Sequence, residues 1–419
     1  MSPASMSPLY RKIAWRLVPF LMLLYMVAFL DRVNISFAAL TMNRDLGISE
    51  SVYGFAAGIF FLSYCLFEVP ANLVLARLGA RRWLAILMVI WGIISMATAF
   101  VHSKETYVGA RFLLGIAESG FYPGVIYYFT FWLPRTLRTR ILAIFLLAVP
   151  LCNSIGSPIS AHILQLNNFS GLRGWQWLFL MEGAPAVILG VAAWFLLADG
   201  PWSAAWLSRE ERQELTTHLN QDEKPVSEET ARQGPNIARD CVIYFLWSSG
   251  NYGLTFWLPK VLVVAGASNL STGWWATATF GFGALAMLWA SRRRGFRALP
   301  FLFLAATMGF VGAALAHSVL AAVASFSLAA IGLLAALPIF WSLASSRLTG
   351  KVAGAAIALV NSVGAVGAFA GPFAMGWLHD VTHHYSAGLW AIAGGMALGG
   401  CLVYSESAKR PSVVPQAAD

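Results

Sequence analysis

The sequence has few charged residues and few cysteines. Only 11% of its 419 residues are Asp, Glu, Lys or Arg, whereas a soluble domain carries about 25%. Because a soluble protein needs a polar surface, this shortage excludes that class. The cysteines lie in or at the ends of apolar stretches and lack metal-ligand spacing, so we expect no disulfide, bound metal or cofactor. They are Cys65, Cys152, Cys241 and Cys401.

Hydrophobic residues make up 58% of the chain, and its mean hydropathy is +0.67. Apolar stretches recur that are long enough to cross a hydrocarbon core of about 30 Å. We therefore predict an all-α integral membrane protein with twelve transmembrane helices, surrounded by the lipid bilayer. The predicted spans are 14–40, 52–76, 83–101, 106–132, 138–162, 175–198, 239–264, 272–291, 298–317, 319–343, 352–378 and 386–405.

A polar stretch, 199–238, separates the first six spans from the last six. We therefore predict two six-helix bundles, within 1–198 and 239–419, joined by a linker. In the linker, Ser208 and Glu211 have the spacing of a helix capping box. A short surface helix is expected over 208–219, in a segment that acts as a tether.

Lys and Arg residues cluster on one side of this predicted topology. With both termini in the cytoplasm, 22 of the 28 fall inside and three outside, as expected for a multi-pass protein of the plasma membrane, such as a bacterial inner membrane. The net charge of +9 then reflects topology and not nucleic acid binding. The inside clusters fall at 11–16, 77–82, 135–140, 209–239, 292–297, 347–351 and 409–410.

A few ionisable residues lie inside the predicted spans of the first half. An ionisable side chain at membrane depth is costly, so each is a functional hypothesis. They are Asp31, Arg32, Glu68, Arg111 and Glu118. The second half has mainly neutral polar residues at depth, among them Asn251, Ser342, Ser345 and Asn361.

Glu118 and Arg111 share one face of their helix with Tyr122. This face must point into the bundle, because lipid does not tolerate it. Asp31 lies within roughly 6 Å of the depth of Arg111, so we expect these two to form an ion pair. The alternative, a charge network that only orders the bundle, remains open.

Glu118 has no cation one turn away on its own helix, so we expect it to be unpaired and suited to carry a proton. Arg32 cannot lose its charge and is left as the free cation for a substrate carboxylate. Tyr64 and Tyr122 are expected in the cavity. Lys260, near the outer end of its span, is expected to extend to the membrane interface.

Several motifs, taken in order along the chain, resemble the major facilitator superfamily and, within it, the anion:cation symporter family. The two halves also show a weak repeat, with basic loops after the second and eighth spans, as in transporters built from repeated halves. The matching segments are Leu30-Asp31-Arg32-Val33-Asn34, Glu68-Val69-Pro70-Ala71-Asn72, Leu78-Gly79-Ala80-Arg81-Arg82-Trp83, Arg111 to Gly115 with Ala117-Glu118, and Trp175-Gln176-Trp177-Leu178-Phe179 with Glu182-Gly183 and Pro185.

The resemblance implies the fold of this superfamily, two pseudo-symmetric bundles, and roles for single residues. Asp31 and Glu118 would be the protonation pair, and Arg111 would be the charge partner of Asp31. The residues implied or expected to contact substrate are Arg32, Tyr64, Tyr122, Ser345 and Asn361.

The sequence also departs from the family pattern. Ala76 stands before Arg77, where the superfamily usually has an acidic residue. Phe29 and Val149 replace a tyrosine and a glutamine found in several sugar-acid carriers, which argues for a less hydroxylated substrate.

From these features we predict a proton-coupled symporter that imports a small organic carboxylate by alternating access, working as a monomer. An exchanger without net proton movement and a sensor that has lost transport remain alternatives. No convincing nucleophile–base pair occurs at depth, so we do not expect an enzyme.

Overall fold

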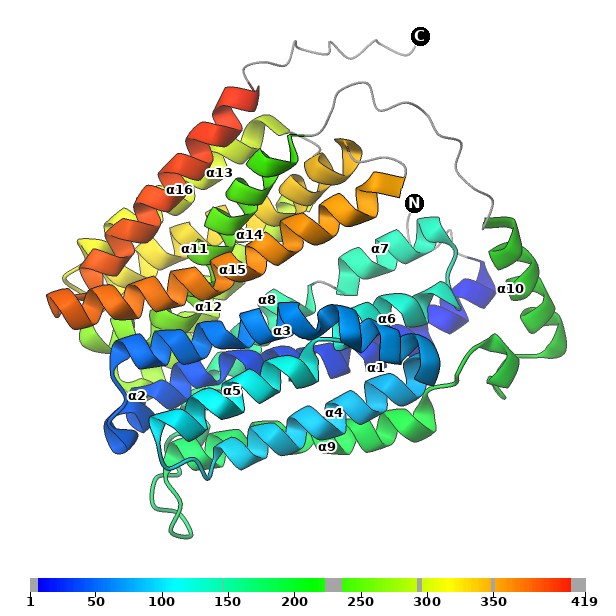
Figure 1. Cartoon of the computed structure of the whole chain (residues 1–419), viewed down its shortest axis with the longest axis horizontal. Coiled ribbons are helices and arrows are strands. Elements are labelled where there is room, and N and C mark those ends of the chain that lie inside the picture. The colour runs from blue at the N-terminus through cyan, green and yellow to red at the C-terminus, as the bar shows by residue number, and fades with distance from the viewer. Residues whose placement is uncertain (1–6, 146, 223–235, 292–295, 348–350, 408–419) are drawn as a thin grey trace.

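The computed structural model describes residues 7–145, 147–222, 236–291, 296–347 and 351–407. Within these ranges the chain is almost entirely helical and forms no β-strand. The helices run along the long axis of the molecule and gather into two bundles, one from each half of the chain (Figure 1). The predicted all-α, twelve-span fold is confirmed.

In the described residues the first bundle comprises nine helices. Two of its six predicted spans are broken, between α1 and α2 and between α5 and α6. A third span is divided into α7 and α8 on either side of residue 146, which lies outside the described residues. The bounds are α1 Pro8–Val33, α2 Ile35–Leu46, α3 Glu50–Leu78, α4 Ala80–Thr98, α5 Lys104–Glu118, α6 Phe121–Thr130, α7 Arg135–Phe145, α8 Ala148–Ile163 and α9 Gly174–Leu196.

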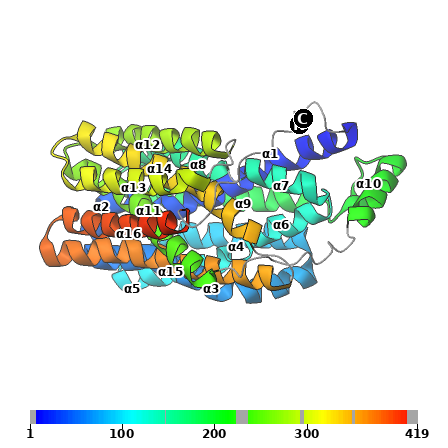
Figure 2. The ribbon, with the colours of Figure 1, turned by 90° about the horizontal axis from the view of Figure 1, so that it is seen from above.

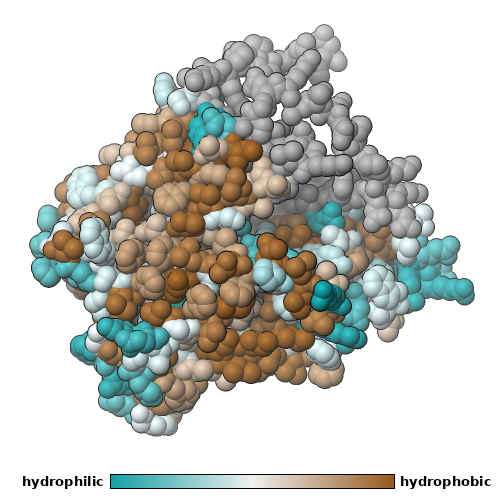
Figure 3. Space-filling model, viewed as in Figure 1, coloured by the Kyte–Doolittle hydropathy of each residue, from teal (hydrophilic) through white to brown (hydrophobic). Residues whose placement is uncertain are grey.

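The second bundle has six helices, each covering one predicted span. They are α11 Ile237–Val264, α12 Asn269–Ser291, α13 Leu299–Ala314, α14 Val319–Arg347, α15 Lys351–Thr382 and α16 Tyr385–Ser407. Short 3-10 turns occur at Pro201–Ser203 and Phe296–Ala298. Hydrophobic side chains cover much of the face seen in Figure 3, and polar ones gather toward the ends of the helices. This is the surface of a protein that lies in a membrane.

The break between α5 and α6 falls at Gly120, which packs closely against another helix. Gly120 lies against the ring of Trp83, and a Cβ atom on Gly120 would be only 2.6 Å from the Trp83 Nε1 atom. The same indole N–H donates to the carbonyl oxygen of Gly120 at 3.2 Å. Non-helical backbone is tolerated at membrane depth where protein groups supply such partners. The break places Glu118 at the very end of α5.

The two bundles meet mainly along α3 with α15 and α8 with α12, and less extensively along α2 with α11. The first two pairs are seen from two directions in Figures 1 and 2. On α3, Gly54 and Gly58 face the backbone of α15, where added Cβ atoms would lie 2.4 Å from the Pro372 oxygen and 2.9 Å from the Phe369 Cα. Small residues of this kind let membrane helices approach closely.

The linker contains helix α10, Arg209–Asp222, beside the first bundle at one end of the molecule (Figure 1). The predicted capping box is confirmed. The Glu211 N–H donates to Ser208 Oγ at 3.1 Å, and the Ser208 N–H donates to Glu211 Oε2 at 2.9 Å. Lys12 of α1 forms a 2.7 Å ion pair with Glu211, which attaches α10 to the first bundle. We call this end of the molecule the α10 end.

Candidate functional site

A cavity of about 950 Å³ lies between the two bundles. Residues of α1, α3, α5 and α6 line one side, and residues of α11, α14 and α15 line the other. The lining continues to Leu75 and Ala76 in the last turns of α3 and to Thr130 at the end of α6. The cavity therefore extends from the middle of the molecule toward the α10 end.

An ion pair between two helices stands on the cavity wall. Arg32 Nη2 of α1 lies 2.7 Å from Glu118 Oε2 of α5, and both residues line the cavity. The side chain of Glu118 is 1% exposed and that of Arg32 is 13% exposed. The predictions that Glu118 is unpaired and that Arg32 is a free cation are therefore wrong. The partner comes from a different helix, which spacing along one helix cannot reveal.

Aromatic rings surround the Arg32 guanidinium. Its Cζ atom lies 5.1 Å from the ring centroid of Phe29, 5.0 Å from that of Phe60 and 5.4 Å from that of Tyr64. Cation–π contacts hold a guanidinium more strongly where water is excluded. Tyr64, predicted to contact substrate, thus lines the cavity beside the cation.

Asp31 points away from this cavity. It is 1% exposed, and its Oδ1 atom accepts hydrogen bonds from the Ser95 hydroxyl of α4 and from Asn34 Nδ2 at 3.1 Å. Successive residues of a helix point about 100° apart, which explains why neighbouring Asp31 and Arg32 have different surroundings. Asp31 therefore belongs to a different hydrogen-bond network from Glu118, the other predicted protonation residue, but it lies close enough for the two groups to interact electrostatically.

Asp31 and Arg111 form no direct ion pair among the described residues, but they lie close enough for their charges to interact. Arg111 is 1% exposed, and its guanidinium carbon lies 4.9 Å from the ring centroid of Phe60. Its Nε and Nη2 atoms are buried without a hydrogen-bond partner among the described residues. The role of Arg111 as charge partner of Asp31 stays a prediction.

The remaining predicted substrate contacts come from both bundles. Tyr122 of α6 and Asn361 of α15 both line the cavity. Ser345 lies in α14, but its side chain is outside the described residues.

Sequence reasoning did not single out one buried carboxyl and several cavity rings. Glu182 of α9 is 2% exposed, and its Oε1 atom accepts a hydrogen bond from the Ser160 hydroxyl at 2.6 Å. Its position in an apolar stretch was a usable signal. The rings of Tyr25, Tyr244, Tyr252 and Trp341 also line the cavity, but aromatic residues are too common in this sequence to single these out.

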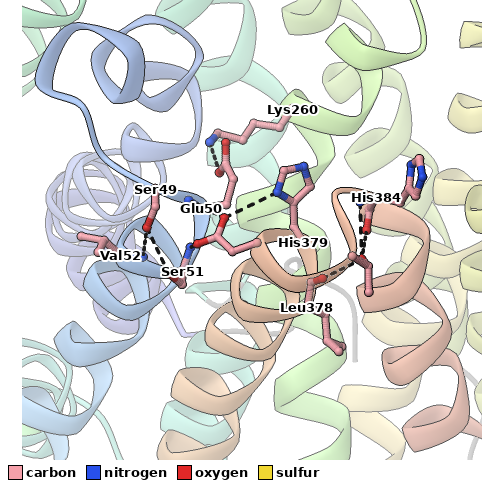
Figure 4. A network of polar contacts seen from close by, with 10 residues as sticks. Ser49, Glu50, Ser51, Val52, Lys260, Leu378, His379 and His384 are labelled. Carbon is pink, nitrogen blue, oxygen red and sulfur yellow. Dashed lines mark hydrogen bonds and ion pairs between the residues drawn. The ribbon is translucent and has the colours of Figure 1, made fainter.

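Charged contacts between the bundles lie at the end opposite α10 (Figure 4). Lys260 of α11 pairs with Glu50 at the start of α3. The Glu50 and Ser51 N–H groups donate to the Asp380 carboxylate of α15 at 3.2 and 2.9 Å. His379 Nδ1 lies 3.6 Å from Asp380 Oδ1.

Lys260 was expected to extend to the membrane interface, and this prediction is wrong. The residue is 5% exposed, and its ammonium lies 4.5 Å from the Tyr53 ring centroid. Glu50 supplies the counter-charge from the other bundle, which keeps Lys260 inside the protein. These contacts join the bundles at this end, whereas the cavity extends toward the α10 end.

Among the described residues, no group of three or more His, Cys, Asp or Glu side chains is placed to hold a metal ion. One guanidinium is held by one carboxylate on a cavity wall. A second anion can compete for that guanidinium if the carboxylate becomes protonated.

Known proteins with similar sequences are transporters. A candidate tartrate transporter of Agrobacterium vitis is 44% identical over 394 residues, covering 92% of this chain and 91% of the relative. A candidate metabolite transport protein of Pseudomonas putida, NicT, is 38% identical, and the match covers 96% of this chain and 95% of the relative.

Solved structures show the same fold. A bacterial homologue of the human lysosomal transporter Spinster, inward-facing and occupied, has a TM-score of 0.79 at 15% identity, covering 97% of this chain and 98% of that one. The profile of the Major Facilitator Superfamily matches residues 21–372. The chain belongs to the Major Facilitator Superfamily, as its motifs predicted.

Proposed function

We propose that this protein is a proton-coupled symporter that imports a small organic carboxylate across the plasma membrane, as in a bacterial inner membrane. The asymmetry of Lys and Arg places both termini and α10 in the cytoplasm. In that orientation the cavity extends toward the cytoplasm. The names of the relatives support an organic acid as substrate.

The observation that carries the proposal is the Arg32–Glu118 ion pair on the cavity wall. Arg32 stays charged at any accessible pH, so Glu118 is the member that can change. When Glu118 takes a proton, its attraction for Arg32 falls, and the guanidinium is free to bind a substrate carboxylate. When the substrate leaves, Glu118 can lose its proton and pair with Arg32 again.

This exchange links the proton to the substrate. An unpaired guanidinium inside the protein is costly, so Arg32 favours having either ionised Glu118 or the substrate beside it. If Glu118 is protonated from the outside and both the proton and the substrate are released inside, the result is symport. Asp31, which lies behind this pair against Ser95 and Asn34, is proposed as a second protonation site.

Alternating access would move the bundles within 1–198 and 239–419 against each other, with 199–238 as the tether. The contacts of Glu50 with Lys260 and Asp380 join the two bundles at the outer end. These contacts must separate when the outer end opens. The described conformation corresponds to the inward-facing state of such a cycle.

Glu118→Gln tests the coupling, because glutamine has the shape and neutrality of the protonated acid but cannot release a proton. In proteoliposomes, we expect this variant to exchange labelled for unlabelled substrate but not to accumulate it under an inward proton gradient. Glu68→Gln is the matched control, because Glu68 lines the same cavity but has no ion pair among the described residues; it should still accumulate substrate.

Proton-driven accumulation at the wild-type rate in Glu118→Gln would remove Glu118 from coupling. If the wild-type protein exchanges substrate equally well with and without a pH gradient and never accumulates it, the protein is an exchanger. If it binds substrate but moves none, it is a sensor.

A further inference from the structure

We propose that the substrate is a planar aromatic monocarboxylate, and not a hydroxylated dicarboxylate. This inference rests on the proposed function and assigns the substrate class of the same cavity. Two features carry it: the number of cations that face the cavity, and the kind of side chain that forms its walls.

Arg32 is the one Lys or Arg among the described residues that line the cavity, and two carboxylates, Glu118 and Glu68, line it as well. One guanidinium matches one carboxylate. If Glu118 is protonated, a bound monocarboxylate leaves the Arg32 pair neutral. A dicarboxylate would bring a second negative charge into the cavity with no described cation to meet it, and with Glu68 in the same lining. Such an unpaired charge is strongly disfavoured in a partly dehydrated site.

Aromatic side chains form much of the wall on both sides of the cavity. Among the described lining residues, the first bundle contributes six rings and the second contributes three. They are Tyr25, Phe61, Tyr64, Phe121, Tyr122 and Tyr127, and Tyr244, Tyr252 and Trp341. A flat ring bound between such walls can make offset or edge-to-face contacts, which favour aromatic ligands beyond the area that they bury.

Stacking behind the cavity holds these rings in place. Tyr25 stacks on Phe145 with ring centroids 4.6 Å apart. Tyr244 stacks on Trp247 and on Phe340, at 5.3 Å from each. Walls that are already ordered lose little freedom when a ligand binds, which favours a rigid, planar ligand.

Tyr252 lies where the two bundles meet. Its ring centroid is 4.2 Å from that of Phe61, which belongs to the other bundle. Arg32 is on the Phe61 side of the cavity, within 5.4 Å of the Tyr64 ring. A substrate whose carboxylate pairs with Arg32 would therefore meet rings of both bundles with its body.

Most neutral polar groups of the described lining are hydroxyls carried on aromatic rings. The non-aromatic neutral polar side chains are Asn72, Thr130, Ser248 and Asn361. Each hydroxyl of a sugar acid or of tartrate needs partners when it leaves water. A ligand that uses the tyrosine hydroxyls also contacts their rings, and a flat apolar ring with a single polar substituent fits these surroundings.

The first test compares three anions by the thermal stabilisation of the purified full-length protein. Benzoate supplies a planar ring, cyclohexanecarboxylate has the same charge without planarity, and tartrate has two carboxylates and two hydroxyls. We expect benzoate to bind at least tenfold more tightly than tartrate, and several-fold more tightly than cyclohexanecarboxylate.

The second test changes one ring. Tyr252→Leu should weaken benzoate binding roughly two- to tenfold more than cyclohexanecarboxylate binding, the range measured for aromatic pairs. Tyr252→Phe keeps the ring but removes the hydroxyl beside Arg32, so it should retain the preference for benzoate over cyclohexanecarboxylate. A loss of folding would instead lower binding of both anions together.

Tighter binding of tartrate than of benzoate would overturn the assigned class. The proposed function would stand in that case, provided that tartrate binding requires Arg32. Equal binding of benzoate and cyclohexanecarboxylate would also overturn the claim of planarity. If Arg32→Ala binds every anion as the wild type does, the proposed function itself is wrong.

Discussion

The two bundles share one fold but have different interiors. The first holds Asp31, Arg32, Arg111, Glu118 and Glu182, all in the inward faces of its helices. The second buries Asp240 and Lys260 away from the cavity lining, and it faces the cavity with rings and neutral groups, mainly from α11, α14 and α15. Because a buried charge is costly, a protein needs a reason to keep several in one half. We infer a division of work, in which the first bundle handles charge and the second shapes the body of the substrate.

Removing the cation of the first bundle should have the largest effect. Arg32→Ala leaves the substrate carboxylate without a counter-charge, which costs about 2–5 kcal/mol, or roughly 30-fold or more in affinity. Isothermal titration with a bound carboxylate measures this loss. Arg32→Lys keeps the positive charge but not the planar guanidinium, so its affinity for the carboxylate should lie between that of the wild type and that of Arg32→Ala. Binding of Arg32→Ala within tenfold of the wild type would show that Arg32 is structural.

Adding a negative charge to the cavity side of the second bundle should weaken binding of the anion. Asn361 lines the cavity from α15, so Asn361→Asp places a carboxylate on the neutral side. We expect affinity for the anion to fall about tenfold or more through repulsion. Asn361→Ala is the control; losing one hydrogen bond should cost about 1 kcal/mol, roughly fivefold. If Asn361→Asp and Asn361→Ala weaken binding equally, the neutrality of this bundle has no role.

The outer contact between the bundles should have a moderate effect. Lys260→Met removes a hydrogen-bonded ion pair with Glu50, worth about 1.5–3 kcal/mol for a charged group. We expect the population to shift toward the outward-open state, seen as faster labelling, from outside, of a cysteine at cavity residue Ser248. Lys260→Arg retains the charge and should label slowly. Unchanged labelling in Lys260→Met would mean that this contact does not restrain opening.

The exposed ion pair between Lys12 and Glu211 should have the smallest effect on stability and transport. Lys12 and Glu211 are 2.7 Å apart, as are Arg32 and Glu118, but their side chains are 44% and 27% exposed. Exposed pairs contribute little, because water and salt screen them. Glu211→Gln should therefore change the melting temperature only slightly and leave transport intact. A large loss of transport would give the linker a role beyond tethering.

The small stabilisation by the Lys12–Glu211 pair should decrease as the pH falls. The Lys12 ammonium donates to Glu211 and holds the pKa of that carboxyl below its usual value. A lowered folded pKa adds stability above the unfolded pKa of about 4.3, and this stability is lost as the pH falls through the lower folded value. The melting difference between wild type and Glu211→Gln should thus disappear in acid.

Local signals in the sequence predicted much of this protein. The apolar stretches predicted the twelve spans, and the spacing of Ser208 and Glu211 predicted the start of α10. Asp31, Arg32 and Glu118 could be selected because an ionisable residue inside an apolar stretch stands out by itself. The close packing at Gly120 could not be found in this way, because the ring of Trp83, from another helix, fills the space where a side chain would lie.

Composition and pattern therefore determined the membrane class, the spans and the set of buried charges, since each depends on the chain and its solvent alone. Only the tertiary structure decided which charges meet. Glu118 pairs with Arg32, Asp31 faces Ser95, and Lys260 pairs with Glu50. The physical reason is that an ion pair requires two side chains to point at each other within about 4 Å. The rotation and tilt of packed helices set those directions, and no spacing along one helix contains that information.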